Sequence, residues 1–86
     1  MVEKRVIVTN TEGLHARPAT DFADLAGRQP VVVTIRKDGS ASQQADSVLG
    51  LMMLGVACGD AVTLSAEGEG AEQAITQLAS LLDGAH

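Results

Sequence analysis

Aromatic side chains are almost absent from this 86-residue sequence, which has no tryptophan, no tyrosine and a single phenylalanine, Phe22. A core built from it must therefore rest on valine, leucine, isoleucine, alanine and the three methionines. Two cores would each need more chain than this, and one core of this size buries only roughly 60–65% of the surface exposed in the unfolded state. We expect one domain over residues 1–86.

Cysteine and basic residues are also scarce. Cys58 stands alone, so it forms no intramolecular disulfide, and no other histidine or cysteine lies near it at metal-ligand spacing. We expect a core or turn position for Cys58, no metal site and no cofactor. Six lysines and arginines against eleven aspartates and glutamates give a net charge of −5, and they form no basic run, which argues against a nucleic-acid partner.

Long apolar runs are missing too. No run approaches the roughly 20 residues needed to cross a bilayer, and residues 1–5 lack the apolar stretch of a signal peptide. We therefore predict a cytoplasmic protein that inserts into no membrane.

What the sequence does contain is regular apolar patterning. Alternation and β-branched residues predict strands over residues 2–9, 31–37, 40–45 and 61–66. Spacings of three or four predict helices over 16–27 and 48–54, and a last helix with apolar positions from Ala71 to Leu82 that Gly84 ends. The order β-α-β-β-α-β-α predicts an α+β fold: a four-stranded antiparallel sheet with three helices on one face and water on the other.

Two connections carry local signals. Asp38-Gly39 indicates a two-residue hairpin between the second and third strands, and the polar third strand is expected at a sheet edge. Pro18 is compatible with a helix because a proline in the first turn lacks only an N–H that has no intrahelical partner there. Gly27 can end that first helix, whose expected apolar face consists of Ala16, Ala19, Phe22, Ala23 and Ala26.

The second helix is unusually apolar. Ser47 is its expected N-cap and Gly55 its expected end. A short helix on a small domain can bury only one stripe, so part of its apolar surface should stay exposed as a patch that meets a partner. The side chains expected in that patch are Val48, Leu49, Met52 and Met53.

His15 is the candidate for chemistry, because it lies in the run from Glu12 to Thr20, where a loop turns into a helix. The first-turn N–H groups, the positive end of the helix dipole and Arg17 would all favour an anion there and disfavour the imidazolium. A neutral ring nitrogen could accept a phosphoryl group. No candidate metal-binding carboxylate pair or nucleotide loop accompanies it, so a phosphoryl carrier fits better than an enzyme.

Two blocks resemble a known family. The run Gly13-Leu14-His15-Ala16-Arg17-Pro18-Ala19-Thr20 resembles the active-site signature of the histidine-containing phosphocarrier proteins, the HPr family of the bacterial phosphotransferase system. The segment from Ala45 to Asp60 is similar to the family's segment around its regulatory serine. The resemblance spans essentially the whole chain and implies an open-faced β-sandwich.

This resemblance implies a set of roles and partners. His15 would receive a phosphoryl group on Nδ1 from phosphorylated enzyme I, which takes it from phosphoenolpyruvate, and pass it to a IIA domain of a sugar permease. Arg17 would stabilise the phosphate together with the first turn at Ala16 and Arg17. The first two helices would form one docking face, and a monomer is expected. The docking residues would be Thr20, Val48, Leu49, Met52 and Met53.

Ser47 matches the serine that a dedicated HPr kinase/phosphorylase modifies in many members of the family. A role as N-cap explains the serine without regulation, and Asp46 beside it would repel an added phosphate. The hairpin from Gly39 to Ala45 is about one residue longer than in commoner members. Residues 47–54 lean toward the nitrogen-branch paralogue, whereas Gly50 and residues 55–57 lean toward the sugar carrier.

Two alternatives to the sugar carrier therefore stay open. One is a regulatory phosphocarrier of the nitrogen branch. The other, from a different class, is a sensing or scaffold domain that is not phosphorylated, in which His15 is only a cap and the methionine-rich helix binds a protein.

Overall fold

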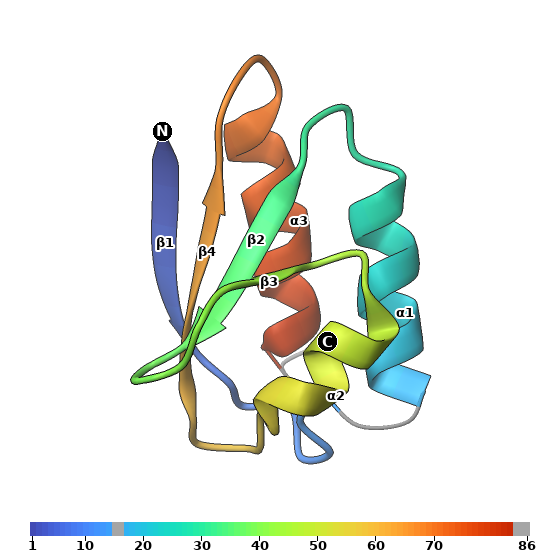
Figure 1. Ribbon diagram of the computed structural model, residues 1–86, viewed down its shortest axis with the longest axis vertical. Helices are drawn as coiled ribbons and strands as arrows, with labels where there is room; N and C mark the ends of the chain where they lie inside the picture. Colours follow the sequence, from blue (N-terminus) through green and yellow to red (C-terminus); the bar gives the residue numbers. More distant parts are fainter. Residues whose placement is uncertain (15–16, 84–86) are drawn as a thin grey trace.

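The computed structural model describes residues 1–14 and 17–83 and has the expected order of strands and helices (Figure 1). The first half of the chain forms β1 (Val2–Ile7), α1 (Arg17–Gly27), β2 (Val33–Lys37) and β3 (Gln43–Gln44). The second half forms α2 (Val48–Leu54), β4 (Ala61–Ala66) and α3 (Ala71–Leu82). The predicted α+β fold, an open-faced antiparallel sheet with three helices, is confirmed.

The sheet is centred on β4. Its strand order is β1-β4-β2-β3, with every neighbouring pair antiparallel, so the predicted edge position of β3 is confirmed. β1 is shorter than predicted, because Thr9 and Asn10 both donate their N–H groups to the carbonyl of Leu82 at the end of α3 instead of pairing with β4. β2 begins at Val33 and not at residue 31.

The connection between β2 and β3 corrects the predicted hairpin. A tight turn does form at Asp38-Gly39: Ser40 donates its N–H to the carbonyl of Lys37 at 2.9 Å, and Gly39 has φ of +85°. The first β2–β3 pair, however, is Ile35 with Gln43, and residues 38–42 connect the two strands. The predicted strand over 40–45 forms only at Gln43–Gln44, because the exposed residues 40–42 bury too little surface to hold a ladder.

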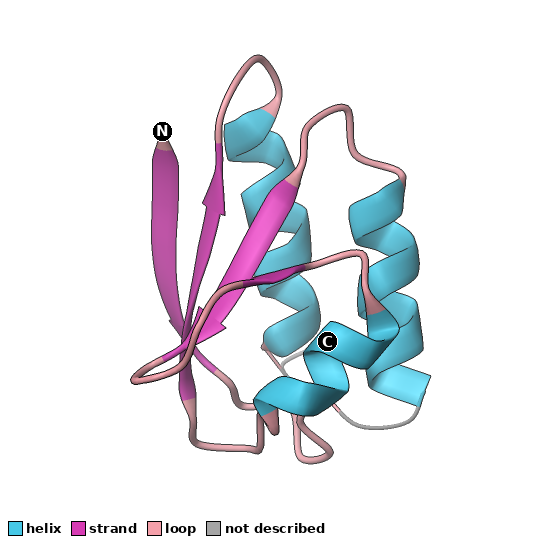
Figure 2. Cartoon of the chain, in the orientation of Figure 1, coloured by secondary structure: helices cyan, strands magenta, loops and turns pink. Residues whose placement is uncertain are grey.

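The helices lie together on one side of the sheet (Figure 2). Phe22, Leu51 and Leu78, one from each helix, are fully buried and meet Ile35 and Leu64 of the sheet in one core. The predicted apolar face of α1 is confirmed by the burial of Ala19, Phe22, Ala23 and Ala26, while Ala16 lies outside the described residues.

The predicted ends of α2 agree with the structure, and the predicted end of α3 lies outside the described residues. Ser47 caps α2 by accepting the N–H of Gly50 at 3.0 Å, and Gly55 ends it in the left-handed conformation, as predicted. α3 ends at Leu82 with Asp83 as its C-cap; Gly84, the expected end, lies outside the described residues. None of the helices described here is long and apolar enough to cross a bilayer.

Candidate functional site

The loop that leads to His15 is held by one asparagine side chain. The Oδ1 atom of Asn10 accepts the backbone N–H of Glu12 at 3.1 Å, and its Nδ2 atom donates to the carbonyl of Gly13 at 3.2 Å. The backbone N–H of Asn10 donates to the carbonyl of Leu82, so the loop is also tied to the end of α3. An asparagine that satisfies nearby backbone groups in this way fixes the shape of a turn.

Gly13 and Leu14 anchor the last residues before His15. Leu14 is 1% exposed, and its N–H donates to the carbonyl of Val56 at 3.0 Å. Gly13 has φ of +64°, and a Cβ atom there would lie 2.4 Å from the carbonyl oxygen of Val56. Only glycine allows this close approach of two backbone segments. The family signature therefore begins at a point fixed to the segment after α2.

That segment, residues 55–60, is itself held by a half-buried ion pair. The Nζ atom of Lys37 lies 3.2 Å from a carboxylate oxygen of Asp60 and donates to the carbonyl of Gly55, also at 3.2 Å. The same carboxylate accepts the N–H of Ala57 at 2.9 Å. The hydrogen bond from Ala57, followed by the contact with Lys37, lowers the pKa of Asp60 below its ordinary value of 3.8. We call Lys37 and Asp60 the turn clamp.

Arg17 opens α1 two residues after His15 in the sequence. Its side chain is 90% exposed, and its Nε atom lies 3.9 Å from a carboxylate oxygen of Asp21, one helical turn further on. A guanidinium so exposed and so loosely paired can turn toward an anion at the start of the helix at little cost. His15 and Ala16 lie outside the described residues.

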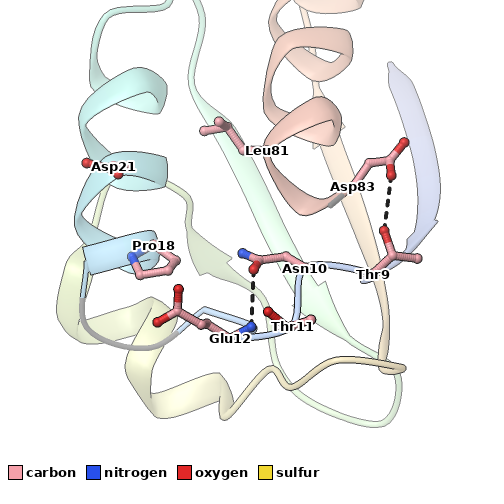
Figure 3. Close-up of a pocket in the computed structure, with 8 residues that line it drawn as sticks. All are labelled: Thr9, Asn10, Thr11, Glu12, Pro18, Asp21, Leu81 and Asp83. Atoms are coloured by element: carbon pink, nitrogen blue, oxygen red, sulfur yellow. Dashed lines mark hydrogen bonds between the residues drawn. The ribbon is translucent and has the colours of Figure 1, made fainter. Parts of the chain in front are cut away.

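A hollow of about 310 Å³ lies beside the start of α1 (Figure 3). Its wall is formed by the loop of residues 9–12, by Pro18 and Asp21 of α1, and by Leu81 and Asp83 at the end of α3. Glu12, Asp21 and Asp83 bring carboxylates to it, and Asp83 accepts the hydroxyl of Thr9 at 3.1 Å. In the part of the chain that the structure describes, no three such side chains have the geometry to hold a metal ion.

The exposed patch predicted on α2 is confirmed. Leu49 and Met53 are each 70% exposed, Met52 is 50% exposed and Val48 is 37% exposed. Their helix packs beside α1, on which Thr20 is also exposed (Figure 1). The structure thus brings together, on one side of the molecule, the described residues predicted for docking and the start of α1.

The structure also shows the contacts of Ser47 and Cys58. Ser47 is half-buried as the α2 cap, and its hydroxyl already accepts one backbone N–H. Cys58 is exposed in a turn, as one of the two expected positions, with its Sγ atom 3.8 Å from the carbonyl oxygen of Thr9.

The supporting residues were not identified from the sequence. The roles of Asn10 and Val56 and the turn clamp depend on contacts between segments far apart in the chain, which no local pattern reveals. Of these residues, only Asn10 could have been predicted from the sequence, since an asparagine three residues before a glycine is typical of a turn stabilised by a side chain.

Comparisons with known proteins agree with this geometry. The family model described as PTS HPr component phosphorylation site matches residues 2–83. Phosphocarrier protein HPr of Streptomyces coelicolor is 43% identical over 82 residues, covering 95% of this chain and 88% of that protein. Phosphocarrier protein NPr of Shewanella violacea is 39% identical over 82 residues, covering 95% and 89%.

A solved structure gives the same result at the level of the fold. The crystal structure of phosphocarrier protein HPr from Bacillus anthracis matches with a TM-score of 0.90 and 40% identity, covering 94% of this chain and 95% of that one. These matches place the chain in the class of phosphocarriers of the phosphotransferase system, which carry phosphoryl groups and are not catalytic enzymes. Within that class, the chain belongs to the HPr family.

Proposed function

We propose that His15 accepts a phosphoryl group on Nδ1 from phosphorylated enzyme I and passes it to the IIA domain of a sugar permease. In the first step the lone pair of His15 Nδ1 forms the new bond to phosphorus, and enzyme I keeps the electron pair of the bond that breaks. In the second step the acceptor on the IIA domain supplies the electron pair, and His15 Nδ1 keeps the pair of the P–N bond that breaks. Atoms and charge therefore balance without a cofactor. The chain would act as a monomer in this relay.

The observation that carries the proposal is the position of Arg17. It opens α1 two residues after His15 in the sequence and has a 90% exposed side chain, next to first-turn N–H groups that have no intrahelical partner. These groups favour negative oxygens at the start of the helix, so they would stabilise a phosphoryl group without rebuilding the loop. Leu14, anchored in the core, would keep the accepting residue in register with that helix start.

The direct test is phosphotransfer from labelled phosphoenolpyruvate through enzyme I. We expect acid-labile, alkali-stable phosphate on the protein and none on His15→Ala. Undiminished labelling of His15→Ala would contradict the proposal.

Arg17 has its own test. Arg17→Ala should keep the fold, because the exposed pair with Asp21 contributes little, but it should slow transfer about tenfold or more through loss of charge-assisted contacts to the phosphate. Arg36→Ala is the control, since Arg36 is also loosely paired, at 3.7 Å from Glu3, and has a side chain that is 42% exposed, but lies on β2. Equal rates for the two variants would remove Arg17 from the mechanism.

The second candidate is the nitrogen branch, which the 39% identity to an NPr protein favours. The two branches differ in the acceptor. Phosphorylated protein would be mixed with a IIA domain of each branch, and we expect faster transfer to the sugar-branch domain. The reverse order would assign the protein to the nitrogen branch.

Regulation at Ser47 is a separate proposal. Incubation with ATP and an HPr kinase/phosphorylase should add phosphate to the wild-type protein and not to Ser47→Ala. An unmodified wild-type protein would leave Ser47 with its capping role alone.

A further inference from the structure

The peptide group between Gly13 and Leu14 is held at both ends by residues from other parts of the chain. Its carbonyl, that of Gly13, accepts a hydrogen bond from Nδ2 of Asn10 at 3.2 Å. Its N–H, that of Leu14, donates to the carbonyl of Val56 at 3.0 Å. Because a peptide group is planar and rigid, bonds to both ends fix the direction in which the chain leaves it. The next residue along the chain after Leu14 is His15.

Asn10 uses all of its polar groups to shape the turn in front of that peptide group. Its side-chain oxygen accepts the N–H of Glu12 at 3.1 Å (Figure 3), and its backbone carbonyl accepts the N–H of Gly13, also at 3.1 Å. Its backbone N–H donates to the carbonyl of Leu82. An aspartate has the same shape but, when ionised, has no donor for the carbonyl of Gly13.

The backbone on the other side of Asn10 is fixed to α3. The carbonyl of Leu82, the last residue of α3, accepts the N–H groups of both Thr9 and Asn10, at 2.9 and 3.1 Å. Carbonyls in the last turn of a helix have no intrahelical partner, so this one is available to the loop. Asn10 therefore connects the end of α3 to the peptide group before Leu14, just as Val56 connects it to the segment after α2.

We infer that Asn10 is a positioning residue for the phosphoryl transfer proposed for His15. In this role it acts through the backbone of Gly13 and Leu14, and not by contact with the phosphoryl group. The reacting atoms must be closely aligned, and a displacement of about 1 Å can slow a reaction about a hundredfold. This inference rests on the proposed function. Asn10 lies outside the Gly13–Thr20 signature, so the family resemblance assigns it no role.

The test measures the rate of phosphorylation by phosphorylated enzyme I as the concentration of this protein is varied. Asn10→Ala removes both side-chain hydrogen bonds and leaves the backbone hydrogen bonds in place. We expect kcat to fall about tenfold or more and KM to stay within about twofold of the wild type, because alignment is lost and binding is not. A raised KM with an unchanged kcat would overturn the inference.

The matched control is Gln29→Ala. Gln29 is also a half-buried amide whose side chain makes two hydrogen bonds, to the carbonyl of Leu25 at 3.0 Å and to Oε1 of Gln77 at 3.1 Å. It lies beyond the end of α1, whereas the loop of Asn10 precedes the start of that helix. The two variants should have similar midpoints of urea unfolding, since each loses two hydrogen bonds of the same kind. Gln29→Ala should keep the wild-type kcat, and an equal fall in both variants would overturn the inference.

A second pair of variants tests the donor alone and decides the question if Asn10→Ala does not fold. At neutral pH the carboxylate of Asn10→Asp can still accept the N–H of Glu12 but cannot donate to the carbonyl of Gly13. Thr11→Asp places the same charge on the next residue, which is exposed, and leaves Asn10 intact. We expect kcat to be about fivefold or more lower in Asn10→Asp than in Thr11→Asp. Equal values would show that the added charge, and not the lost donor, slows the transfer.

Amide hydrogen exchange gives a structural readout beside the kinetic one. The N–H of Leu14 should exchange several-fold faster in Asn10→Ala than in Gln29→Ala, because only the first variant frees one end of its peptide group. Unchanged exchange would contradict the positioning role. A labelled wild type together with wild-type kcat in both Asn10 variants would refute this role alone. A wild type that acquires no phosphate would refute the proposed function and this role with it.

Discussion

Gly13 is the residue at which the site depends most directly on the backbone. It combines a left-handed conformation with contact to the carbonyl of Val56, so any side chain must push two segments apart. Because Leu14 donates to that same carbonyl, such a displacement would reach the residue directly before His15.

We therefore predict that Gly13→Ala lowers the free energy of unfolding by about 3 kcal/mol or more. Gly39→Ala is the matched control, because Gly39 also has positive φ but nothing lies within 4 Å of its added Cβ. That variant should lose only about 1–2 kcal/mol, the cost of the left-handed conformation. Urea unfolding measures both, and equal losses would show that the contact with Val56 is unimportant.

Ser47 gives a second prediction at the scale of one residue. Ser47→Ala removes the acceptor for the N–H of Gly50 and should lower the free energy of unfolding by about 1 kcal/mol. Ser47→Asn keeps a capping acceptor and should stay within a few tenths of a kcal/mol of the wild type. If both variants were equally stable, the cap would contribute nothing, and regulation would become the stronger reason for a serine there.

At the scale of elements, the turn clamp joins β2 to the segment that follows α2. Lys37 ends β2, Asp60 precedes β4, and between them they hold Gly55 and Ala57 on either side of Val56. Since Val56 supports Leu14, the clamp acts on the signature through the backbone and without touching it.

The clamp should make stability depend on acid pH. The pKa of Asp60 is lowered in the folded state, so its contribution is fully present above its ordinary value of 3.8 and is lost as the pH falls through the folded pKa. Asp60→Asn should therefore be less stable than the wild type at about pH 6, and the difference should shrink below about pH 4. Lys37→Met should show the same convergence, and a difference independent of pH would contradict the assignment.

The sequence predicted elements well where local chemistry decides them. Ser47 and Gly55 bound α2 as expected because a cap and a left-handed glycine act within one turn of the helix. The length of β3 was overestimated for the opposite reason: whether residues 40–42 join the sheet depends on packing that their own side chains cannot supply. The same holds for the residues of the site. Arg17 could be predicted because it lies in a local motif, whereas the turn clamp could not, because it joins positions 23 residues apart.

At the scale of the whole molecule, the two layers have different surfaces. The sheet carries an ion pair between strands, Arg36 of β2 with Glu3 of β1 at 3.7 Å, and β4 between them presents the nearly buried Thr63 and Ser65. The helical side instead exposes the apolar patch of α2. Binding of a protein partner should therefore be sensitive to α2 and insensitive to exposed apolar residues elsewhere.

Leu49→Ala and Val32→Ala test this division, because the two side chains are 70% and 69% exposed and Val32 lies outside α2, just before β2. Neither change should lower the free energy of unfolding by more than about 0.5 kcal/mol, since both sites are on the surface. Leu49→Ala should weaken binding to enzyme I by about 1 kcal/mol or more, as expected for an anchor in an interface. Equal binding by both variants would exclude Leu49 from the interface.

The strand order also determines when the fold can be completed. β1 and β2 both pair with β4 and not with each other, so the strand that unites the sheet is the last of the four to leave the ribosome. Val2 pairs with Ala66, which closes residues 2–66 into one loop and predicts slower folding than a protein of mainly local contacts would show. Until β4 has been synthesised, the first strand has no partner in the sheet. Its unpaired backbone groups are then open to association with other chains, unless a chaperone covers them.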